Sequence, residues 1–258
     1  PGANVFAVEV HQASPGSSDM VLGLSVEALI VTNSVEAAGV MINEVLANNS
    51  DLAEADGSTP DWIELYNPST ATVDLAGMSL SDNNLIPARW VFPPGSLLPG
   101  RSFARISFSA DLPVSATNTG FGLSANGGAV FLFNKPGEGG TLQSSITYGL
   151  QAANWSIGRA PDGTTNWVLT VPSLGASNIT ATLGNPQSLK INEWMADPAT
   201  GDDWFELFNP NPEPVNISRF LLSDSLTDRA KHTLPALSFI GAGARGYQKF
   251  EADELLTS

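Results

Sequence analysis

Short runs that alternate apolar and polar residues, separated by turn residues, recur along the chain. The run DWIELYNP at residues 61–68 places Ile63 and Leu65 on one face of a strand and Trp62 and Glu64 on the other. The runs are bounded by Pro, Gly and Asn, and no amphipathic helix of useful length interrupts them. The pattern therefore predicts an all-β protein, and the regular strand spacing predicts a sandwich.

Further strands are expected on both sides of this run. Two apolar stretches near the start of the chain, residues 5–10 and 20–31, favour the β conformation. Turns that contain Pro-Gly, Asn-Gly or Gly-Gly steps separate the later strands. Those strands are expected at residues 40–46, 73–81, 90–92, 103–108, 129–134, 144–148 and 167–171.

The motifs of this series occur a second time in the same order. Residues 191–193 (INE) repeat residues 42–44, and residues 203–210 (DWFELFNP) repeat residues 61–68. A Leu-Ser-Asp step follows in both copies. A repeat of this kind indicates two related structural units.

The two copies differ in the length of one loop. Glu193 lies 149 residues after Glu44, whereas Trp204 lies 142 residues after Trp62. The loop between these strands is therefore shorter in the second copy, and loops accept such changes more readily than cores.

Two substitutions also distinguish the copies. Arg219 stands where the first copy has Gly77, and His232 stands where it has Trp90. These departures leave the exact strand pairing of the second copy open.

The repeat divides the chain into four segments. Residues 1–34 are expected to be the last strands of a truncated sandwich, and residues 37–178 a complete one. Residues 179–188 are expected to be a linker, and residues 189–258 a truncated second sandwich. The chain is thus expected to be a piece of a longer protein, with an unfinished sheet edge in its last segment.

Charge narrows the range of partners. The chain carries 26 Asp and Glu against 11 Lys and Arg, for a net charge of −15. Because nucleic acids and anionic lipids are bound through Lys and Arg, no nucleic-acid partner is expected, and neither is docking on a lipid surface. No apolar stretch approaches the roughly 18 residues of a spanning helix, so no membrane insertion is expected. The lack of Cys excludes disulfides and thiolate metal sites.

Taken together, the motifs resemble the lamin tail domain in its bacterial form. They are INE, DWIELYNP, VDLAG with LSD, and WSIGR at residues 155–159. The resemblance implies an immunoglobulin-like β-sandwich, followed by a truncated copy of it, used as an accessory or adhesion module in large secreted or surface proteins. The opening residues 2–12 are similar to the last strands of a galactose-binding-like sandwich.

The polar and aromatic residues of the motif are expected to have structural roles in both copies. They are Glu44, Trp62, Glu64, Asn67 and Asp82 in the first copy, and Glu193, Trp204, Glu206, Asn209 and Asp224 in the second.

Glu44 with Glu64, and Glu193 with Glu206, are the carboxylates that a functional interpretation would select first. A glycosidase uses two carboxyl groups roughly 5–10 Å apart, which neighbouring strands can supply. The alternative, which the repetition favours, is that each Glu accepts hydrogen bonds from backbone or Arg beside the Trp and stabilises the sandwich. On that interpretation Glu64→Gln lowers the melting temperature.

The loop after residue 46 collects oxygen ligands of the kind that Ca²⁺ prefers, at Asp51, Glu54, Asp56 and Asp61. Their spacing is not that of an EF-hand, and a solvated loop of turn-forming residues is the favoured interpretation. No cofactor is therefore expected, with Ca²⁺ kept as a weak candidate.

Other chemistry has little support in the sequence. The two His residues, His11 and His232, lie outside the complete unit, which excludes a Ser-His-Asp site there. The Gly-rich residues 135–141 lack the order of a phosphate-binding loop and predict a hairpin turn. Trp62, Trp155 and Trp204 could form a sugar-stacking platform, but packing in the core or at a sheet edge is favoured.

We therefore expect a non-catalytic structural, adhesion or binding module of an extracellular or cell-surface protein. Its expected partners are an extracellular polymer or protein and other domains of the same parent chain. The alternative is a carbohydrate-binding module attached to an extracellular enzyme. A third class, an enzyme that acts through the paired Glu residues, predicts hydrolysis of glycosides.

Overall fold

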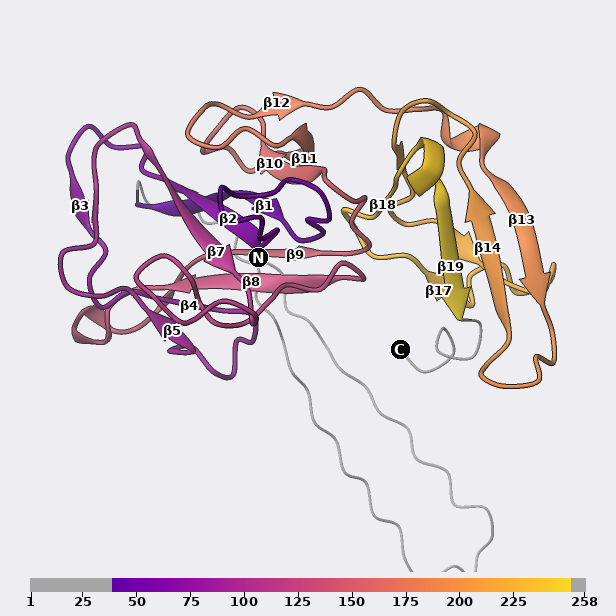
Figure 1. Cartoon of the computed structure of the whole chain (residues 1–258), viewed down its shortest axis with the longest axis horizontal. Coiled ribbons are helices and arrows are strands. Elements are labelled where there is room, and N and C mark those ends of the chain that lie inside the picture. Colours follow the sequence, from indigo (N-terminus) through magenta and orange to yellow (C-terminus); the bar gives the residue numbers. More distant parts are fainter. Residues whose placement is uncertain (1–38, 252–258) are drawn as a thin grey trace, which may run out of the picture. The chain divides into compact units, whose positions relative to one another are not determined.

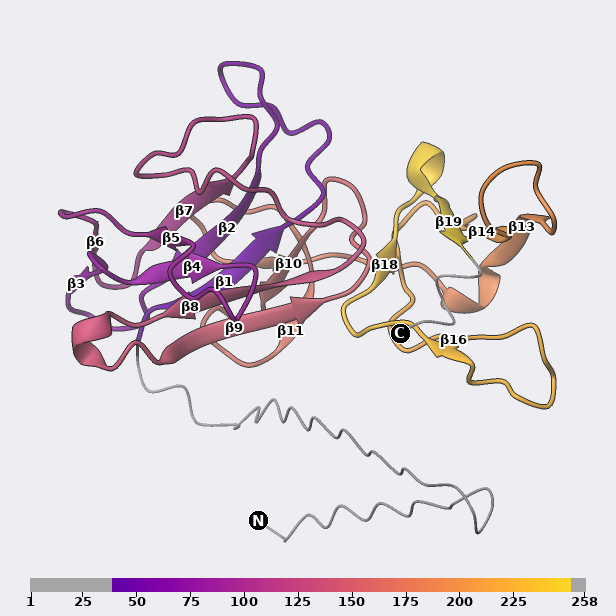
Figure 2. The ribbon, with the colours of Figure 1, turned by 90° about the horizontal axis from the view of Figure 1, so that it is seen from below.

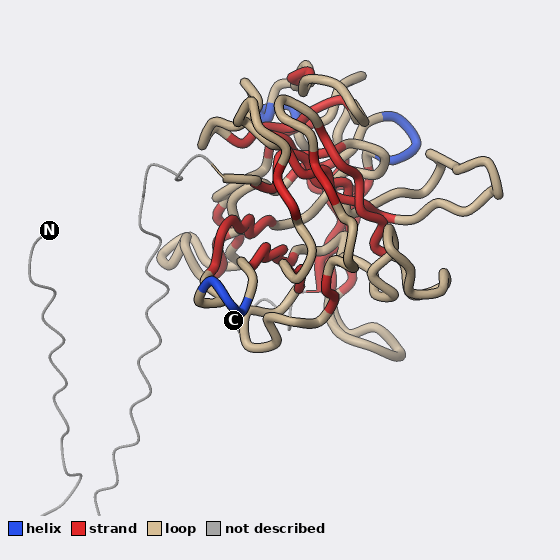
Figure 3. The backbone as a smooth tube through the Cα atoms, turned by 90° about the vertical axis from the view of Figure 1, so that its left-hand side faces the viewer, coloured by secondary structure: helices blue, strands red, loops and turns tan. Residues whose placement is uncertain are grey.

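The computed structural model describes residues 39–251, which lie within one compact unit, Glu36–Ser258. In this range the chain consists of β-strands joined by loops and three short 3-10 helices (Figures 1 and 3). Residues 5–10 and 20–31, with the segment similar to a galactose-binding sandwich, lie outside the described residues. Among residues 39–251 no helix has the length and apolar content that a membrane crossing requires.

The first part of the described chain forms a six-stranded antiparallel sheet. Its strands are β1 (Met41–Leu46), β2 (Asp61–Tyr66), β7 (Phe103–Phe108), β10 (Ser156–Arg159), β11 (Trp167–Val171) and β12 (Ile179–Thr180). Their order is β12-β11-β10-β1-β2-β7, so the two strands with the strongest motifs lie at the centre.

A second layer packs against this sheet. It consists of β4 (Ser79–Ser81), β5 (Trp90–Val91), β8 (Gly128–Phe133) and β9 (Leu142–Tyr148), in the order β5-β4-β8-β9. The short strands β3 (Val73–Asp74) and β6 (Leu97–Leu98) form a separate pair. In Figure 1, β8 and β9 run below β1 and β2. One buried cluster joins the layers, with members that include Ile42, Ile63, Leu65, Leu80, Val130, Leu132 and Ile157.

The alternation within β2 decides which side chains enter this core. Ile63 and Leu65 point into the sandwich and are 0% exposed. Trp62 and Glu64 lie on the opposite face of the sheet, yet they are only 2% and 1% exposed, respectively. The outer face of the sheet is therefore covered near these residues, which is where the candidate site lies.

The last part of the described chain forms smaller sheets. The strands β13 (Lys190–Met195), β14 (Trp204–Phe208) and β19 (Tyr247–Glu251) pair in the order β13-β14-β19 (Figure 2). Two further pairs are β15 (Val215–Asn216) with β18 (Phe239–Ile240), and β16 (Leu221–Leu222) with β17 (His232–Thr233). They share a small core of Leu207, Val215, Ile217, Leu234 and Ile240.

The strand pairing of this part matches that of the first. The β1–β2 ladder shifts register between Ile42 and Glu44, and the β13–β14 ladder shifts between Ile191 and Glu193. Each shift leaves an Asn as the extra residue of a β-bulge. Glu44 then pairs with Glu64 across the ladder, and Glu193 pairs with Glu206.

Arg219, one of the two substitutions that distinguish the copies, keeps the local backbone of the first copy. Its φ of 62° is left-handed, as is the φ of 85° at Gly77. The Gly77 N–H donates to the Phe92 carbonyl at 3.0 Å, and the Arg219 N–H donates to the Leu234 carbonyl at 2.9 Å. The same turn is thus built without glycine, at the cost of backbone strain.

His232, the other substitution, also keeps the pairing of its counterpart. Leu222 pairs with His232 as Leu80 pairs with Trp90. The difference lies in burial, because Trp90 is 4% exposed in the core of the first part whereas His232 is half-buried.

The segment expected to be a linker, residues 179–188, begins inside the six-stranded sheet. Ile179 and Thr180 form β12, paired with β11, and Ala181 is buried in the core. Ile179 and Thr180, both β-branched, pair with the backbone of β11 along an edge that a solvated linker would leave unpaired. Only the later residues serve as a connection, and they include the 3-10 turn η2 (Pro186–Ser188).

Backbone hydrogen bonds join the two residues that follow β9 to the loop before β18 and to the first residue of β18. The Gly149 N–H donates to the Ala236 carbonyl at 2.9 Å, and the Phe239 N–H donates to the Leu150 carbonyl at 2.8 Å. Phe239 is 1% exposed and belongs to the main core cluster. The last part of the described chain is therefore packed on the first through main-chain contacts.

Gly149 is the point at which this junction can be tested. A Cβ at this position would meet Ser238 Oγ at 2.0 Å and Pro235 Cβ at 3.0 Å. We expect Gly149→Val to open the junction and to lower the free energy of unfolding by about 1–3 kcal/mol. Hydrogen exchange measures the effect, and residues 236–240 should lose protection while those of β1 keep it.

The matched control is Gly122→Val, because nothing lies within 4 Å of a Cβ added at that exposed glycine. Equal exchange at residues 236–240 in the two variants would contradict a packed junction.

Candidate functional site

Glu44 and Glu64 meet on the covered outer face of the six-stranded sheet. The two residues are opposite each other in the β1–β2 ladder, and cross-strand partners project to the same side. They are 0% and 1% exposed, respectively. The sequence placed them on neighbouring strands, and the bulge at Asn43 brings them into register.

Glu44 accepts hydrogen bonds from two serines. Ser156 of β10 donates its hydroxyl to Oε1 at 2.6 Å. Ser173, in the loop after β11, donates its backbone N–H to Oε1 at 3.2 Å and its hydroxyl to Oε2 at 3.3 Å. This carboxyl therefore connects three separate segments of the chain.

Glu64 holds the same loop two residues further on. The Gly175 N–H donates to its Oε2 at 2.6 Å. Its Oε1 is buried and has no hydrogen-bond partner in the described part of the chain. Arg105 is opposite Glu64 in the β2–β7 ladder, but its guanidinium pairs with Glu54 instead.

The bulged Asn43 fixes a second loop over the same face. Its Nδ2 donates to Asp162 Oδ1 at 3.0 Å, and its Oδ1 accepts from the Gly163 N–H at 3.0 Å. The Asn178 amide donates to the Asn43 carbonyl at 3.0 Å and to the Arg159 carbonyl at 2.9 Å. Sequence reasoning missed these polar contacts, although the Asn in the repeated INE triplet marked one of them.

Burial raises the pKa of Glu44 and of Glu64 to about 7. At Glu44 the hydrogen bonds from Ser156 and Ser173 oppose this effect, and at Glu64 the bond from Gly175 does. The charge of Glu44 raises the pKa of Glu64 further, and Asp162 acts on both. The pair therefore retains protons near neutral pH.

This arrangement does not provide an open two-carboxyl site. A glycosidase must present both groups to a sugar ring, with space for the substrate between them. Here both carboxyls lie under loops and hold those loops in place. The pair connects the central strands to the loops that cover them.

Glu193 and Glu206 are opposite each other in the same way but are not enclosed. Glu193 is exposed and Glu206 is half-buried. Asn192 donates its Nδ2 to Glu206 Oε1 at 2.8 Å. In residues 182–251 no serine or loop N–H takes the place that Ser156 and Ser173 have at Glu44.

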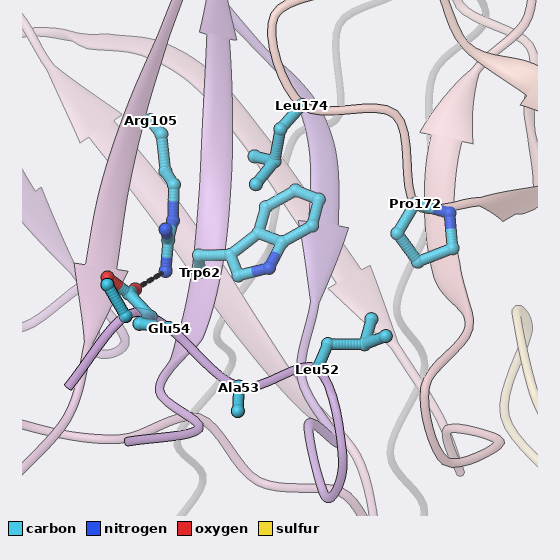
Figure 4. A pocket seen from close by; sticks show the side chains of 8 residues that line it. Leu52, Ala53, Glu54, Trp62, Arg105, Pro172 and Leu174 are labelled. Atoms are coloured by element: carbon cyan, nitrogen blue, oxygen red, sulfur yellow. Dashed lines mark hydrogen bonds and ion pairs between the residues drawn. The ribbon is translucent and has the colours of Figure 1, made fainter. Parts of the chain in front are cut away.

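A shallow pocket of about 410 Å³ opens beside the buried pair. It is lined by Leu52, Ala53, Glu54, Ala55, Trp62, Arg105, Pro172 and Leu174. Figure 4 shows Arg105 next to Trp62, with the Arg105–Glu54 ion pair at one side and Leu174 above the indole ring. Because Trp62 is almost fully buried, its ring face cannot serve as a stacking platform.

The four Ca²⁺ candidates do not converge. Asp51 forms an ion pair with Arg245, Glu54 pairs with Arg105, and Asp56 accepts from Ser58 within its own turn. Asp61 accepts from the backbone N–H groups of Asn49 and Leu123, and burial raises its pKa. Among the described residues no three acidic or His side chains form a group that could hold a metal ion. The four carboxylates therefore have separate partners in the described structure, and the solvated loop remains the favoured interpretation.

The Asn of the motif organises a loop in both copies. Asn67 is 0% exposed, and its Nδ2 donates to the carbonyls of Ala71, Leu98 and Pro99 at 2.8–3.0 Å. Asn209 is 1% exposed and donates to the equivalent carbonyls of Glu213 and Gly241 at 2.9 and 2.7 Å.

The Asp of the Leu-Ser-Asp step forms a surface ion pair in both copies. Asp82 pairs with Arg89, and Asp224 pairs with Lys231. Exposed pairs of this kind contribute little to stability.

The other Trp residues of the motif contribute to packing. Trp155 is half-buried against the core of the first part. Trp204 is half-buried, with Lys249 Nζ 5.1 Å from its ring centroid. Trp194, which sequence reasoning did not select, is 72% exposed on β13.

Two packed antiparallel layers form a β-sandwich, and the lamin tail domain that matches it is immunoglobulin-like. The family model of the lamin tail domain matches residues 33–149, so the chain contains a lamin tail domain. The match ends before β10, β11 and β12, which complete the same six-stranded sheet. Searches of curated proteins and of solved structures gave no match.

The buried pair makes stability depend on pH. Both groups have folded-state pKa values above the ordinary 4.5, so the folded protein binds more protons than the unfolded chain between about pH 4.5 and 7. The stability that this pair contributes is therefore highest below this window, falls as pH rises through it and levels off above it. We expect a loss on the order of 3–5 kcal/mol for the two carboxyls together, measured by urea unfolding at pH 5 and pH 8.

Glu64→Gln tests whether the buried pair causes this pH dependence. The sequence alone predicts that the variant is less stable, whereas burial of Glu64 beside Glu44 predicts that it is not. The amide oxygen still accepts from Gly175, and one of two adjacent buried charges is removed. The variant should be at least as stable as the wild type at pH 8 and should depend less on pH. Glu138→Gln, at an exposed acid, is the control. An unchanged pH dependence in Glu64→Gln would refute the shared role of the pair.

Proposed function

We propose that this chain is a non-catalytic structural and attachment module of a larger secreted or cell-surface protein. The observation that carries the proposal is the burial of Glu44 and Glu64. Their carboxyls accept hydrogen bonds from Ser156, Ser173 and Gly175, and so they fix loops instead of facing a substrate.

The proposal includes a second unit of the lamin tail type in residues 189–251. It is supported by the shared bulge before Glu193, by the Glu193–Glu206 pairing and by the buried Asn209. A stacked aromatic pair at one end of the β2–β7 ladder also recurs at one end of the β14–β19 ladder. Tyr66 and Phe103 have ring centroids 4.8 Å apart, and Phe208 and Tyr247 have them 4.7 Å apart.

A spacing or display role for the two units is supported by how they are joined. Main-chain hydrogen bonds at Gly149 and Phe239 limit the independent motion of the later strands. The net charge of −15 disfavours nucleic acid and anionic lipid as partners. The partner that fits is an extracellular polymer or protein, or another domain of the same parent chain.

The test is an activity screen of the chain on a panel of nitrophenyl glycosides at pH 5 to 8. We expect no turnover above buffer in the wild type, because neither carboxyl can reach a glycosidic oxygen. Glu44→Gln and Glu64→Gln should match the wild type, as should the control Glu138→Gln. Turnover that Glu64→Gln abolishes and Glu138→Gln preserves would overturn the non-catalytic assignment.

A further inference from the structure

The loop between β11 and β12, residues 172–177, is attached to the sheet in a way that allows it to move. Its two ends are fixed, because Val171 is opposite Ile179 in the β11–β12 ladder. Residues 174–177 are exposed, and Gly175 has a left-handed φ of 72°. An exposed segment with few buried contacts can open locally while the strands on both sides stay paired.

We propose that this loop is a lid, held closed by the Glu44 and Glu64 carboxyls, which opens over Trp62 when both carboxyls are ionised. Residues 172–177 are called the lid from here on. The inference goes beyond the structural role proposed above, because it adds a moving part and the signal that moves it.

Two carboxyls of the central strands hold the lid. Ser173 donates its backbone N–H to Glu44 Oε1 at 3.2 Å and its hydroxyl to Oε2 at 3.3 Å. Gly175 donates its N–H to Glu64 Oε2 at 2.6 Å. The Ala176 N–H donates to the Ser173 carbonyl at 3.0 Å, so that bond stays within the lid. The attachment of the lid therefore depends on two ionisable groups.

The side chains of the lid cover Trp62. Pro172 and Leu174 line the pocket of about 410 Å³ together with Trp62, and Figure 4 shows Leu174 above the indole ring. Trp62 is only 2% exposed, although it lies on the outer face of the sheet. Movement of the lid would therefore uncover the indole ring.

Burial and nearby negative charge oppose ionisation of the pair while the lid is closed. Burial is the main cause of the raised pKa of both carboxyls. Asp162, in the loop after β10, raises the pKa of both further, and Glu44 raises that of Glu64. The hydrogen bonds from Ser173 and Gly175 favour the charged form, but they do not outweigh burial.

The positive groups on the neighbouring elements have other partners. Arg105 of β7 forms an ion pair with Glu54 in the loop between β1 and β2. Arg159, at the end of β10, donates to the carbonyls of Ile42 and Thr164. The charges that raise the pKa of the pair are thus negative, and they add to the effect of burial.

Proton linkage gives the direction of the movement. With the lid closed, both carboxyls have a pKa of about 7, whereas a carboxyl in contact with water has the ordinary value of 4.5. Between these values, each rise of one pH unit increases the ratio of open to closed lid by up to roughly tenfold per carboxyl. Above about pH 7 the ratio levels off, because both carboxyls are then ionised in either form.

Hydrogen exchange of the whole chain, followed by mass spectrometry, measures the opening. The protection factor of the lid, corrected for the intrinsic exchange rate at each pH, should fall at least tenfold from pH 5 to pH 8. A local opening exposes little surface, so lid exchange at pH 8 should not change with urea below the unfolding transition. Exchange in β1, which requires global unfolding, should rise with urea.

Variants of the two carboxyls assign the effect to them. Glu44→Gln combined with Glu64→Gln removes both titrating groups, and the amide oxygens can still accept from the lid. Lid protection in this double variant should change less than twofold between pH 5 and pH 8. Glu64→Gln alone should show an intermediate change, and it serves as the test if circular dichroism shows that the double variant does not fold. Glu138→Gln, at an exposed acid, is the control and should match the wild type.

Acrylamide quenching of tryptophan fluorescence measures the uncovering of Trp62. Quenching of the wild type should be stronger at pH 8 than at pH 5. Trp62→Phe should lose this difference, and a difference of the same size in that variant would contradict the uncovering of Trp62.

Three results from hydrogen exchange would overturn the inference. They are equal lid protection at pH 5 and pH 8, a pH effect that Glu64→Gln leaves unchanged, and lid exchange that depends on urea as steeply as exchange in β1. The last result would show that the lid opens only when the whole unit unfolds.

Discussion

Two buried carboxyl groups on adjacent central strands hold the first sandwich together at its outer face. Glu44 and Glu64 are in contact with water in the unfolded chain, and the fold moves both to a region where charge is unfavourable. The structure offsets this cost with hydrogen bonds from Ser156, Ser173 and Gly175. Those donors belong to β10 and to the loop after β11. The pair therefore links the first strands of this unit, β1 and β2, to its last segments.

The β-bulge at Asn43 is the geometric condition for that contact. If Asn43 were paired regularly, Glu44 would lie opposite Ile63 on the core face of the sheet, because a one-residue shift exchanges the two faces. The bulged Asn43 then binds Asp162 and Gly163, so the irregularity also fixes a neighbouring loop. One local defect in the ladder thus positions the buried pair and the cover above it.

In residues 189–251, strands β13 and β14 match β1 and β2 in register but lack that cover. The bulge, the Glu pairing and the aromatic stack are present, but Glu193 is exposed and Trp194 is 72% exposed. The comparison separates local determinants from distant ones. Strand pairing and turns depend on nearby residues, whereas burial of the carboxyl pair requires a neighbouring strand and a loop from more than a hundred residues away, as the contact of Glu44 with Ser156 shows.

The sequence by itself determined the all-β class, the positions of the central strands and the two series of motifs, because alternation and turn residues act over a few positions. It also indicated the lamin tail domain and the structural interpretation of the motif residues. It left Asp51, Glu54, Asp56 and Asp61 as a weak Ca²⁺ candidate beside the favoured solvated loop, and it placed β12 in a linker. Only the tertiary structure decided that Glu44 and Glu64 lie enclosed and that Trp194 lies open. Exposure depends on which distant segment covers a strand, and no pattern of neighbouring residues encodes that.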